Sequence, residues 1–402
     1  MWRLGFFFHE MGFGLLSVFL PLYVVSEAIR GSLFDIGVMS AVALFLAIPA
    51  SMFWGYLCDK TRRYRRFVLL SFSTCAMLLY LFTLTTNVLL LILLYALMAS
   101  LHVAHEPPKN ILIAELYSRP DWEKSFAFYE GFTEAGWLIG LILGFLTSVY
   151  GFSPASTLFL CSGLNLAAFG LSLMLVADPL LVFERSLVSI EKSTDFAYRG
   201  ILLASKFLDG VRVNERLKRE NINAFCCGLV LFSLATSILF TPMPILVSNV
   251  VKSAGLSSSL VFAVFVLNSA GGVLGYYGAG RHSEGREGKA NIGRIVIFRS
   301  LLSFLLLSTI VGLSAMYGAI SLVMILVLMG FVNAMFLVYT LSLSMELIPA
   351  GKAGLFNVLV GIGSACGSFI GPFIAAQAAG FIYVFIVAGI TFFMAYAAFR
   401  IF

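Results

Sequence analysis

The chain contains 402 residues, of which 60% are hydrophobic and only 11% charged, and its formal net charge is +6. A sequence this apolar would not stay in solution as an ordinary globular protein, so that class is excluded. The composition indicates a polytopic membrane protein. The positive charge gives no reason to expect a nucleic-acid partner, because basic loops on one side of a membrane account for it.

Apolar segments follow one another along the whole chain. A helix needs about 20 apolar residues to cross roughly 30 Å of hydrocarbon, where every backbone polar group must find a partner within the protein. The shorter alternating segments of a membrane barrel are absent from the sequence. We therefore predict an all-α membrane protein with twelve transmembrane helices. These lie near residues 4–27, 34–58, 67–87, 88–116, 125–148, 155–177, 222–247, 259–280, 293–313, 318–346, 353–377 and 380–401.

The basic residues predict how these spans are oriented. The loop at 59–66 alone holds five Lys or Arg residues, and short loops of this kind stay on the cytoplasmic side. If the chain starts inside and every span crosses, nearly all of the 26 basic residues fall in inner segments, and only Arg30 and Lys252 fall in outer ones. The sequence thus predicts a multi-pass plasma-membrane protein with both termini in the cytoplasm.

Polar side chains lie unusually deep in the first and fourth spans. His9 and Glu10 lie about 9 Å into the first span at 1.5 Å per residue. The fourth span carries a denser group, His102, His105, Glu106 and Lys109. Offsets of three, four and seven residues place these four on one helix face.

The fourth span also contains Pro107 and Pro108. Proline has no backbone N–H, so the pair should free the carbonyls of Val103 and Ala104 and break the helix. A broken helix is tolerated at membrane depth where it lines protein or water. We therefore expect this turn to face a cavity.

The fifth span adds Glu130 and Glu134, and then glycines at four-residue spacing, which allow two helices to approach closely. The second half of the chain repeats this pattern. Aligning Glu115 with Glu346 also aligns Gly136 and Gly140 of the fifth span with Gly367 and Gly371 of the eleventh. Two pseudo-symmetric six-helix bundles are implied, as is common in secondary transporters.

Residues 178–220 interrupt the apolar pattern with many charged side chains, and six predicted spans lie on each side of them. We predict three parts: an N-terminal bundle at 1–177, a cytoplasmic linker at 178–220, and a C-terminal bundle at 221–402. Within the linker, Leu203, Phe207, Leu208 and Val211 form an apolar stripe. This predicts an amphipathic helix lying on the inner leaflet.

The loop GYLCDKTRRYRR at residues 55–66 resembles the signature loop between the second and third helices of the major facilitator superfamily. Gly55, Asp59, Lys60 and Arg63 match that pattern, and Arg62 stands where the family usually has a second glycine. Together with the twelve spans and their division into six and six, the resemblance covers essentially the whole chain. It implies an alternating-access transporter whose two halves pivot around a central cavity.

The resemblance also implies where several residues lie. Spans 1, 4, 7 and 10 would line the cavity, and spans 2, 5, 8 and 11 would meet between the halves. Asp59 would lie against the start of span 11, where free amides and the helix dipole attract a carboxylate. Gly55 would allow spans 2 and 11 to touch. The expected protein is a transporter and no enzyme, with no catalytic residue, no cofactor and no bound metal.

Ionisable groups within a bilayer are costly and usually mark an ion or substrate path. We therefore predict proton coupling through Glu10, Glu106, Glu130 and Glu134. The substrate cavity is predicted to include His9, His102, His105, Lys109, Asn268, Asn333, Tyr339 and Asn357. Arg299 is expected to extend toward the inner interface, as long basic side chains often do.

Several alternatives stay open. The buried charges can instead form static ion pairs, Lys109 with Glu106 or Glu130, that only join spans four and five. The transporter can export lipophilic compounds, which is slightly favoured, or import a small solute together with protons, and Lys109 would suit an anion as that solute. A remote alternative is an intramembrane metal enzyme, but residue 109 is Lys where the zinc-protease motif requires His. The expected partners are a small-molecule substrate, protons and the lipid bilayer, and the expected state is a monomer.

Overall fold

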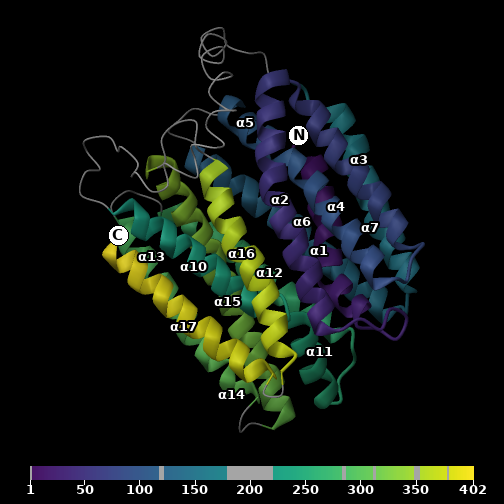
Figure 1. Cartoon of the computed structure of the whole chain (residues 1–402), viewed down its shortest axis with the longest axis vertical. Helices are drawn as coiled ribbons and strands as arrows, with labels where there is room; N and C mark the ends of the chain where they lie inside the picture. Colours follow the sequence, from purple (N-terminus) through teal and green to yellow (C-terminus); the bar gives the residue numbers. More distant parts are fainter. Residues whose placement is uncertain are drawn as a thin grey trace.

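The computed structural model describes residues 2–116, 122–178, 221–282, 287–310, 314–347, 354–377 and 380–402, and within these ranges it contains helices and no strand (Figure 1). The helices are α1 (Leu4–Val24), α2 (Leu33–Thr61), α3 (Tyr64–Phe82), α4 (Val88–His102), η1 (Val103–His105), α5 (Glu106–Leu116), α6 (Trp122–Val149), α7 (Pro154–Leu175), α10 (Ile222–Phe240), α11 (Met243–Ser253), α12 (Leu260–His282), α13 (Glu287–Leu305), α14 (Leu307–Ile310), α15 (Ala315–Leu347), α16 (Gly354–Ala375) and α17 (Gly380–Ile401).

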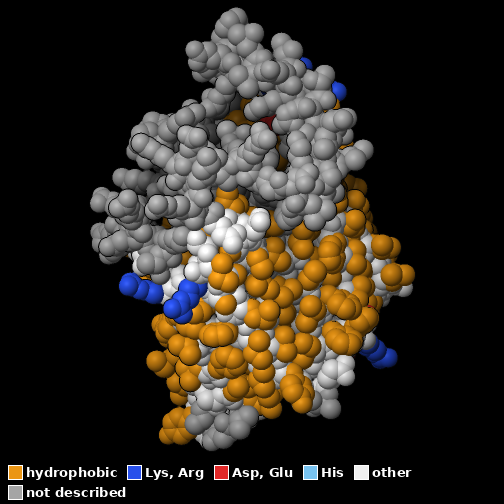
Figure 2. Space-filling view, turned by 60° about the vertical axis from the view of Figure 1, so that its left-hand side comes forward, with side chains coloured by type: hydrophobic (Ala, Val, Ile, Leu, Met, Phe, Trp, Pro, Cys, Tyr) orange, Lys and Arg blue, Asp and Glu red, His pale blue; other side chains and the backbone are white. Residues whose placement is uncertain are grey.

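Within the described ranges, 12 helical stretches are long and apolar enough to cross a membrane, and each overlaps one predicted span. The fourth joins α4, η1 and the start of α5, and the seventh joins α10 and α11. Hydrophobic side chains cover most of the described surface in Figure 2, and the few Lys and Arg side chains lie toward its edges. This distribution fits a protein surrounded by lipid.

The helices form two groups that meet along two helix pairs. In one group α1 packs on α6 and α7, and α3 packs on α7 and α4. In the other, α10 packs on α16 and α17, and α12 packs on α15. The groups meet where α2 packs on α16 and α6 packs on α12. The domain boundaries at 177 and 221 stay predictions, because residues 179–220, with the predicted amphipathic helix, lie outside the described residues.

Glycines allow the closest helix contacts within each group. A Cβ on Gly136 or Gly140 would overlap the backbone of Phe7 or Met11 in α1. A Cβ on Gly367 or Gly371 would likewise overlap the backbone of α10. These four glycines therefore join α6 to α1 and α16 to α10. The side chains of Glu115 and Glu346, which relate the two halves in sequence, are outside the described residues.

The role that the resemblance implies for Gly55 stays a prediction, because the start of α16 is only partly described. A Cβ on Gly55 would have Cγ of Pro107 in α5 as its nearest neighbour, at 3.9 Å. Among the described residues, α2 approaches α16 closely at Gly37, which packs on Pro372, and at Gly361, which packs on Ile48. Gly55 lies near the end of α2, where the helix faces the turn after α4. Asp59 is exposed, and residues 348–353, just before α16, lie outside the described ranges.

Arg62 ends α2 in the left-handed conformation, with φ 55° and ψ 25°. Its backbone N–H donates to the carbonyl of Cys58. A side chain in this conformation costs about 1–2 kcal/mol relative to a right-handed one, and glycine avoids the cost. The family pattern has glycine at this position, and the left-handed conformation of Arg62 is one that glycine adopts without this cost.

Candidate functional site

The fourth span is broken where Pro107 and Pro108 predict a break. α4 ends at His102, a 3-10 turn covers Val103–His105, and α5 begins at Glu106. The carbonyl of Val103, which was predicted to be free, is not. The tighter turn lets the N–H of Glu106 donate to it. The carbonyl of His102 instead accepts from two side chains, Ser71 Oγ at 2.7 Å and His105 Nδ1 at 2.6 Å.

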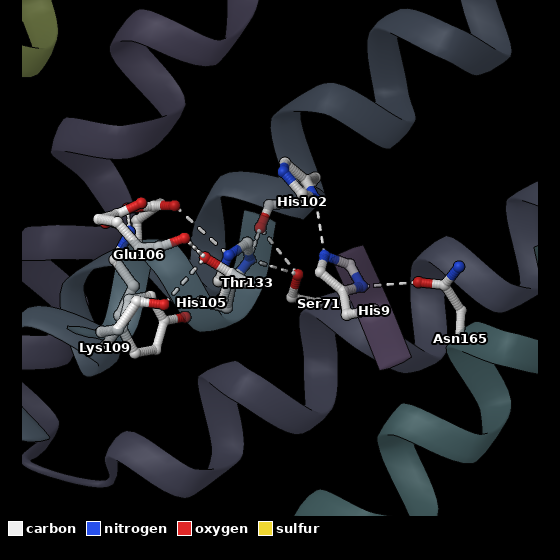
Figure 3. A network of polar contacts seen from close by, with 10 residues as sticks. His9, Ser71, His102, His105, Glu106, Lys109, Thr133 and Asn165 are labelled. Atoms are coloured by element: carbon white, nitrogen blue, oxygen red, sulfur yellow. Dashed lines mark hydrogen bonds and ion pairs between the residues drawn. The ribbon is translucent and has the colours of Figure 1, made fainter. Parts of the chain in front are cut away.

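His9, His102 and His105 form a histidine cluster between α1 and the broken turn (Figure 3). His9 and His105 are buried, with 0% and 1% exposure, and His102 is partly buried. His9 Nδ1 lies 2.6 Å from Asn165 Oδ1, and its Nε2 lies 2.9 Å from His102 Nδ1. Asn165 itself is held by α7, where its Nδ2 donates to the carbonyl of Cys161.

The acceptors in this cluster determine which ring nitrogens carry hydrogen. Asn165 Oδ1 only accepts, so His9 Nδ1 is the donor and its Nε2 accepts from His102 Nδ1. The carbonyl of His102 only accepts, so His105 donates from Nδ1. A neutral His105 therefore has no hydrogen on Nε2, which faces Glu106.

That arrangement places two possible proton acceptors, His105 and Glu106, next to each other. Nε2 of His105 lies 3.4 Å from Oε1 of Glu106. A neutral imidazole with its hydrogen on Nδ1 and an ionised carboxylate would present two lone pairs to each other there. The contact is favourable when either group is protonated. The turn thus contains a position where a proton can be held.

Glu10, Glu106, Lys109 and Glu130 form a charge cluster beside the histidines. Lys109 Nζ lies 2.6 Å from Glu106 Oε2 and 3.6 Å from Glu130 Oε1. Lys109 is 9% exposed and its ammonium lies 5.3 Å from the ring centre of Tyr129. The ion pairs that the static alternative requires are therefore present.

The charge cluster also lines a cavity of about 220 Å³. The walls come from α1, α5 and α6, and the lining residues are Glu10, Glu106, Lys109, Tyr129, Glu130, Thr133, Glu134 and Trp137. We call it the acidic cavity. Three carboxylates of the cluster share one ammonium, so the ion pairs do not neutralise it. The arrangement can bind a cation or protons as well as join helices.

A second cavity, of about 160 Å³, lies among α6, α10, α12, α13 and α15. It is lined by Glu134, Thr236, Phe240, Asn268, Gly272, Tyr276, Arg299, Gly330, Asn333 and Ala334. We call it the arginine cavity. Glu134 lines both cavities, and its Oε1 accepts from Ser269 Oγ of α12 at 2.6 Å. The two cavities thus adjoin at Glu134.

The predicted cavity residues of the second half are not all brought together. Asn268 and Asn333 line the arginine cavity, whereas Tyr339 is buried in the hydrophobic core and Asn357 is exposed. The expectation for Arg299 is wrong. Its side chain is 0% exposed and points into the interior, because three phenylalanine rings and a backbone carbonyl surround its guanidinium.

The site contains further residues that the sequence did not single out. Asn165 and Ser71 orient the histidines, Tyr129 and Thr133 line the acidic cavity, and Ser269 holds Glu134. Each is a common residue within a long apolar helix, so composition and spacing give no signal for it. Only helix packing shows that they face the site.

The three histidines are close enough to hold a metal ion, since one nitrogen of each lies within 4.8 Å of the others. Both ring nitrogens of His9, Nδ1 of His102 and Nδ1 of His105 already make hydrogen bonds within the protein.

Comparison with protein families decides the identity of the fold. The family described as "Major Facilitator Superfamily" matches residues 4–357. The chain belongs to the major facilitator superfamily. It is therefore a multi-pass membrane transporter and not an enzyme, and its substrate is a small molecule.

Relatives and a solved structure agree with this assignment. The chain is 32% identical over 200 residues to the multidrug resistance protein MdtG of Enterobacter lignolyticus strain SCF1. The matched residues are 47% of each chain, so this match spans about half of that relative. It is 29% identical over 392 residues to MdtG of Proteus mirabilis strain HI4320, covering 93% of this transporter and 88% of the relative. The structure of the nucleoside transporter NupG superposes with a TM-score of 0.70 at 15% identity, covering 100% and 98% of the chains, and supports the fold alone.

Proposed function

We propose that this transporter is a proton-coupled exporter of lipophilic small molecules that works by rocking its two halves. The observation that carries the proposal is the 3.4 Å contact between His105 Nε2 and Glu106 Oε1, beside the ion pair of Glu106 with Lys109, where a proton can lie between the two groups. An exporter driven by a proton gradient needs a proton site of this kind. The relatives named multidrug resistance proteins favour export over import.

Protons would exchange at the charge cluster. Glu106 accepts a proton beside His105 while its other oxygen stays paired with Lys109. Lys109 also reaches Glu130, so it keeps one ion pair whichever of the two acids is protonated. Glu10 faces the same cavity and supplies a further carboxylate. The charge of the cavity can therefore change by protonation without leaving a buried ammonium unpaired.

Glu134 would connect the proton site to the substrate site. It lines both cavities and is held by a hydroxyl of α12, across the contact between the two helix groups. When the halves rock, α6 and α12 move relative to each other, and the Ser269 hydrogen bond would form or break. Protonation of Glu134 would thus depend on the state of the cavity.

Proton-coupled uptake of a small anion is a second candidate. The observation that favours it is Arg299, a buried cation that lines the arginine cavity. Both candidates share the proton site and differ in the direction of substrate movement. We further infer a monomer in the plasma membrane with both termini in the cytoplasm, because the basic residues gather in the segments expected on that side.

The test is transport in proteoliposomes with an imposed pH gradient. Ethidium and the neutral dye N-phenyl-1-naphthylamine serve as lipophilic probes, and pyranine inside the vesicles reports proton movement. In the wild type, the gradient should drive dye accumulation and the dye should drive proton movement. Glu10→Gln and Glu106→Gln should abolish both effects, whereas Glu27→Gln, which changes an exposed carboxylate near the end of α1, should leave them intact. Unchanged proton-driven transport in both site variants would end the coupling proposal.

A further inference from the structure

Arg299 lies within a helix that crosses the membrane, without an acidic partner. It lies about 12 Å from the start of the span Asn291–Ile310 at 1.5 Å per residue, well inside the hydrocarbon region. Its side chain is 0% exposed. No described carboxylate lies within ion-pair distance of it. A buried cation of this kind is costly, so a functional reason for it should be sought.

The protein satisfies this guanidinium only in part. Nη1 donates to the carbonyl of Met329 at 2.5 Å. The rings of Phe232, Phe240 and Phe392 lie 5.3–5.6 Å from its central carbon and provide cation–π contacts. Nε and Nη2 have no hydrogen-bond partner. Two donor atoms of a planar fork are therefore buried without a hydrogen-bond partner.

These two donor atoms belong to a residue that lines the arginine cavity. A second unsatisfied group lines the same cavity, because the buried Oγ1 of Thr236 also lacks a hydrogen-bond partner. Phe240 provides an apolar wall. A cavity that combines a cation, a hydroxyl and an aromatic wall suits a ligand with one anionic group and an apolar body.

We propose that the arginine cavity is a binding site for organic monocarboxylates, with Arg299 as the residue that recognises the carboxylate. The guanidinium fork matches the two oxygens of a carboxylate, and Nε with Nη2 would bind both once the side chain turns this edge toward the cavity. A monoanion fits better than a phosphate ester or phosphonate. Arg299 is the only cationic side chain among the described residues that line the cavity, so a dianion would keep an uncompensated charge.

Glu134 restricts when such a ligand can bind. It lines the arginine cavity and carries the only carboxylate among its described lining residues. An ionised Glu134 would repel an incoming carboxylate, and a protonated one would not. The site would therefore admit a carboxylate when Glu134 is protonated. This inference rests on the proposed substrate transport but on neither its direction nor its proton coupling.

The test is ligand binding to the purified full-length protein in nanodiscs at constant ionic strength, followed by thermal unfolding. Benzoate and its neutral isostere benzamide are the matched probes, and phenylphosphonate represents a dianion. Wild-type protein should be stabilised saturably by benzoate, and less by the other two. Arg299→Met should weaken benzoate binding by about tenfold or more, the range expected for loss of a charge-assisted hydrogen bond in a buried site. Lys252→Gln, at the exposed end of α11, should bind benzoate as the wild type does.

Two further results separate recognition from a purely structural role. Arg299→Met should unfold at the same temperature as the wild type or higher without ligand, because it removes an unpaired buried charge. Arg299→Lys keeps the charge without the fork and should bind benzoate more weakly than the wild type. Equal binding of benzoate and benzamide by the wild type, or undiminished benzoate binding by Arg299→Met, would overturn the proposal. If Glu106→Gln loses dye-driven proton movement but still binds benzoate, the result supports separate proton and ligand sites.

Discussion

The two cavities differ in how their buried charged side chains are paired. Around the acidic cavity, Glu106 and Glu130 pair with the ammonium of Lys109 and Glu10 lines the same space, so carboxylates outnumber the cation and protons can adjust the balance. Around the arginine cavity, Arg299 has aromatic rings and one carbonyl but no described carboxylate within ion-pair distance, and the one lining carboxylate, Glu134, accepts from Ser269. The first cavity therefore has an excess of acid, and the second has a cation without an ion pair among the described residues. This difference favours protons as the ligands of one cavity and a charged molecule as the ligand of the other.

The largest expected effect on stability is that of Lys109→Met. Removing the ammonium leaves Glu106 and Glu130 facing each other without a cation. Losing one partner of a fully buried ion pair lowers the free energy of unfolding by about 3–5 kcal/mol. The side chains of Glu106 and Glu130 are about one third exposed, so water screens them and we expect a loss of about 2 kcal/mol. Thermal unfolding in detergent measures the loss. The double variant with Glu106→Gln should recover part of it, and a Lys109→Met protein as stable as the wild type would show that the ion pairs contribute nothing.

A steric effect of similar size is expected at the contact of α6 with α1. Gly140→Ala would press a methyl group into the carbonyl of Met11, and such overpacking costs about 1–3 kcal/mol. Gly163→Ala, on α7, is the matched control, because nothing lies within 4 Å of its Cβ position. The control should be neutral or slightly stabilised, since alanine favours helix. Equal unfolding temperatures for both variants would contradict the close contact.

Loss of the amide that orients the histidine cluster should have a smaller effect. Asn165→Leu keeps the volume of the side chain but leaves His9 Nδ1 without its acceptor, which costs about 1–2 kcal/mol. Leu166→Met, on the lipid-facing side of the same helix with 60% exposure, should change little. The same thermal measurement compares the two. If Asn165→Leu behaves like the control, the cluster is not held from α7.

The smallest expected effect has the opposite sign. Arg62→Gly relieves the left-handed conformation at the end of α2 and should stabilise the protein by up to about 1 kcal/mol. Arg62→Ala keeps a Cβ in that conformation and should give no such gain. A stabilisation of both variants to the same extent would attribute the effect to the lost charge and not to the backbone.

The sequence predicted the parts of this transporter that depend on local chemistry. Hydropathy located all twelve candidate spans, and Pro107 with Pro108 located the broken turn, because span length and the missing N–H are properties of the segment itself. The sequence could not predict the direction of Arg299. Spacing shows which residues share a helix face, but which neighbour that face meets depends on how all helices pack. For the same reason Asn165 was overlooked.

The central claim is that protons bind in the acidic cavity and the ligand binds in the arginine cavity. The most direct test measures, with pyranine in a weakly buffered protein solution, how many protons the protein takes up or releases when it binds ligand. Benzoate should change the number of bound protons in the wild type. The double variant Glu10→Gln with Glu106→Gln should bind benzoate with less proton exchange than the wild type, keeping only the part that Glu134 contributes. Arg299→Met should show benzoate binding weakened by about tenfold or more, and correspondingly less exchange at the same benzoate concentration. Full proton exchange in the double variant would contradict the account.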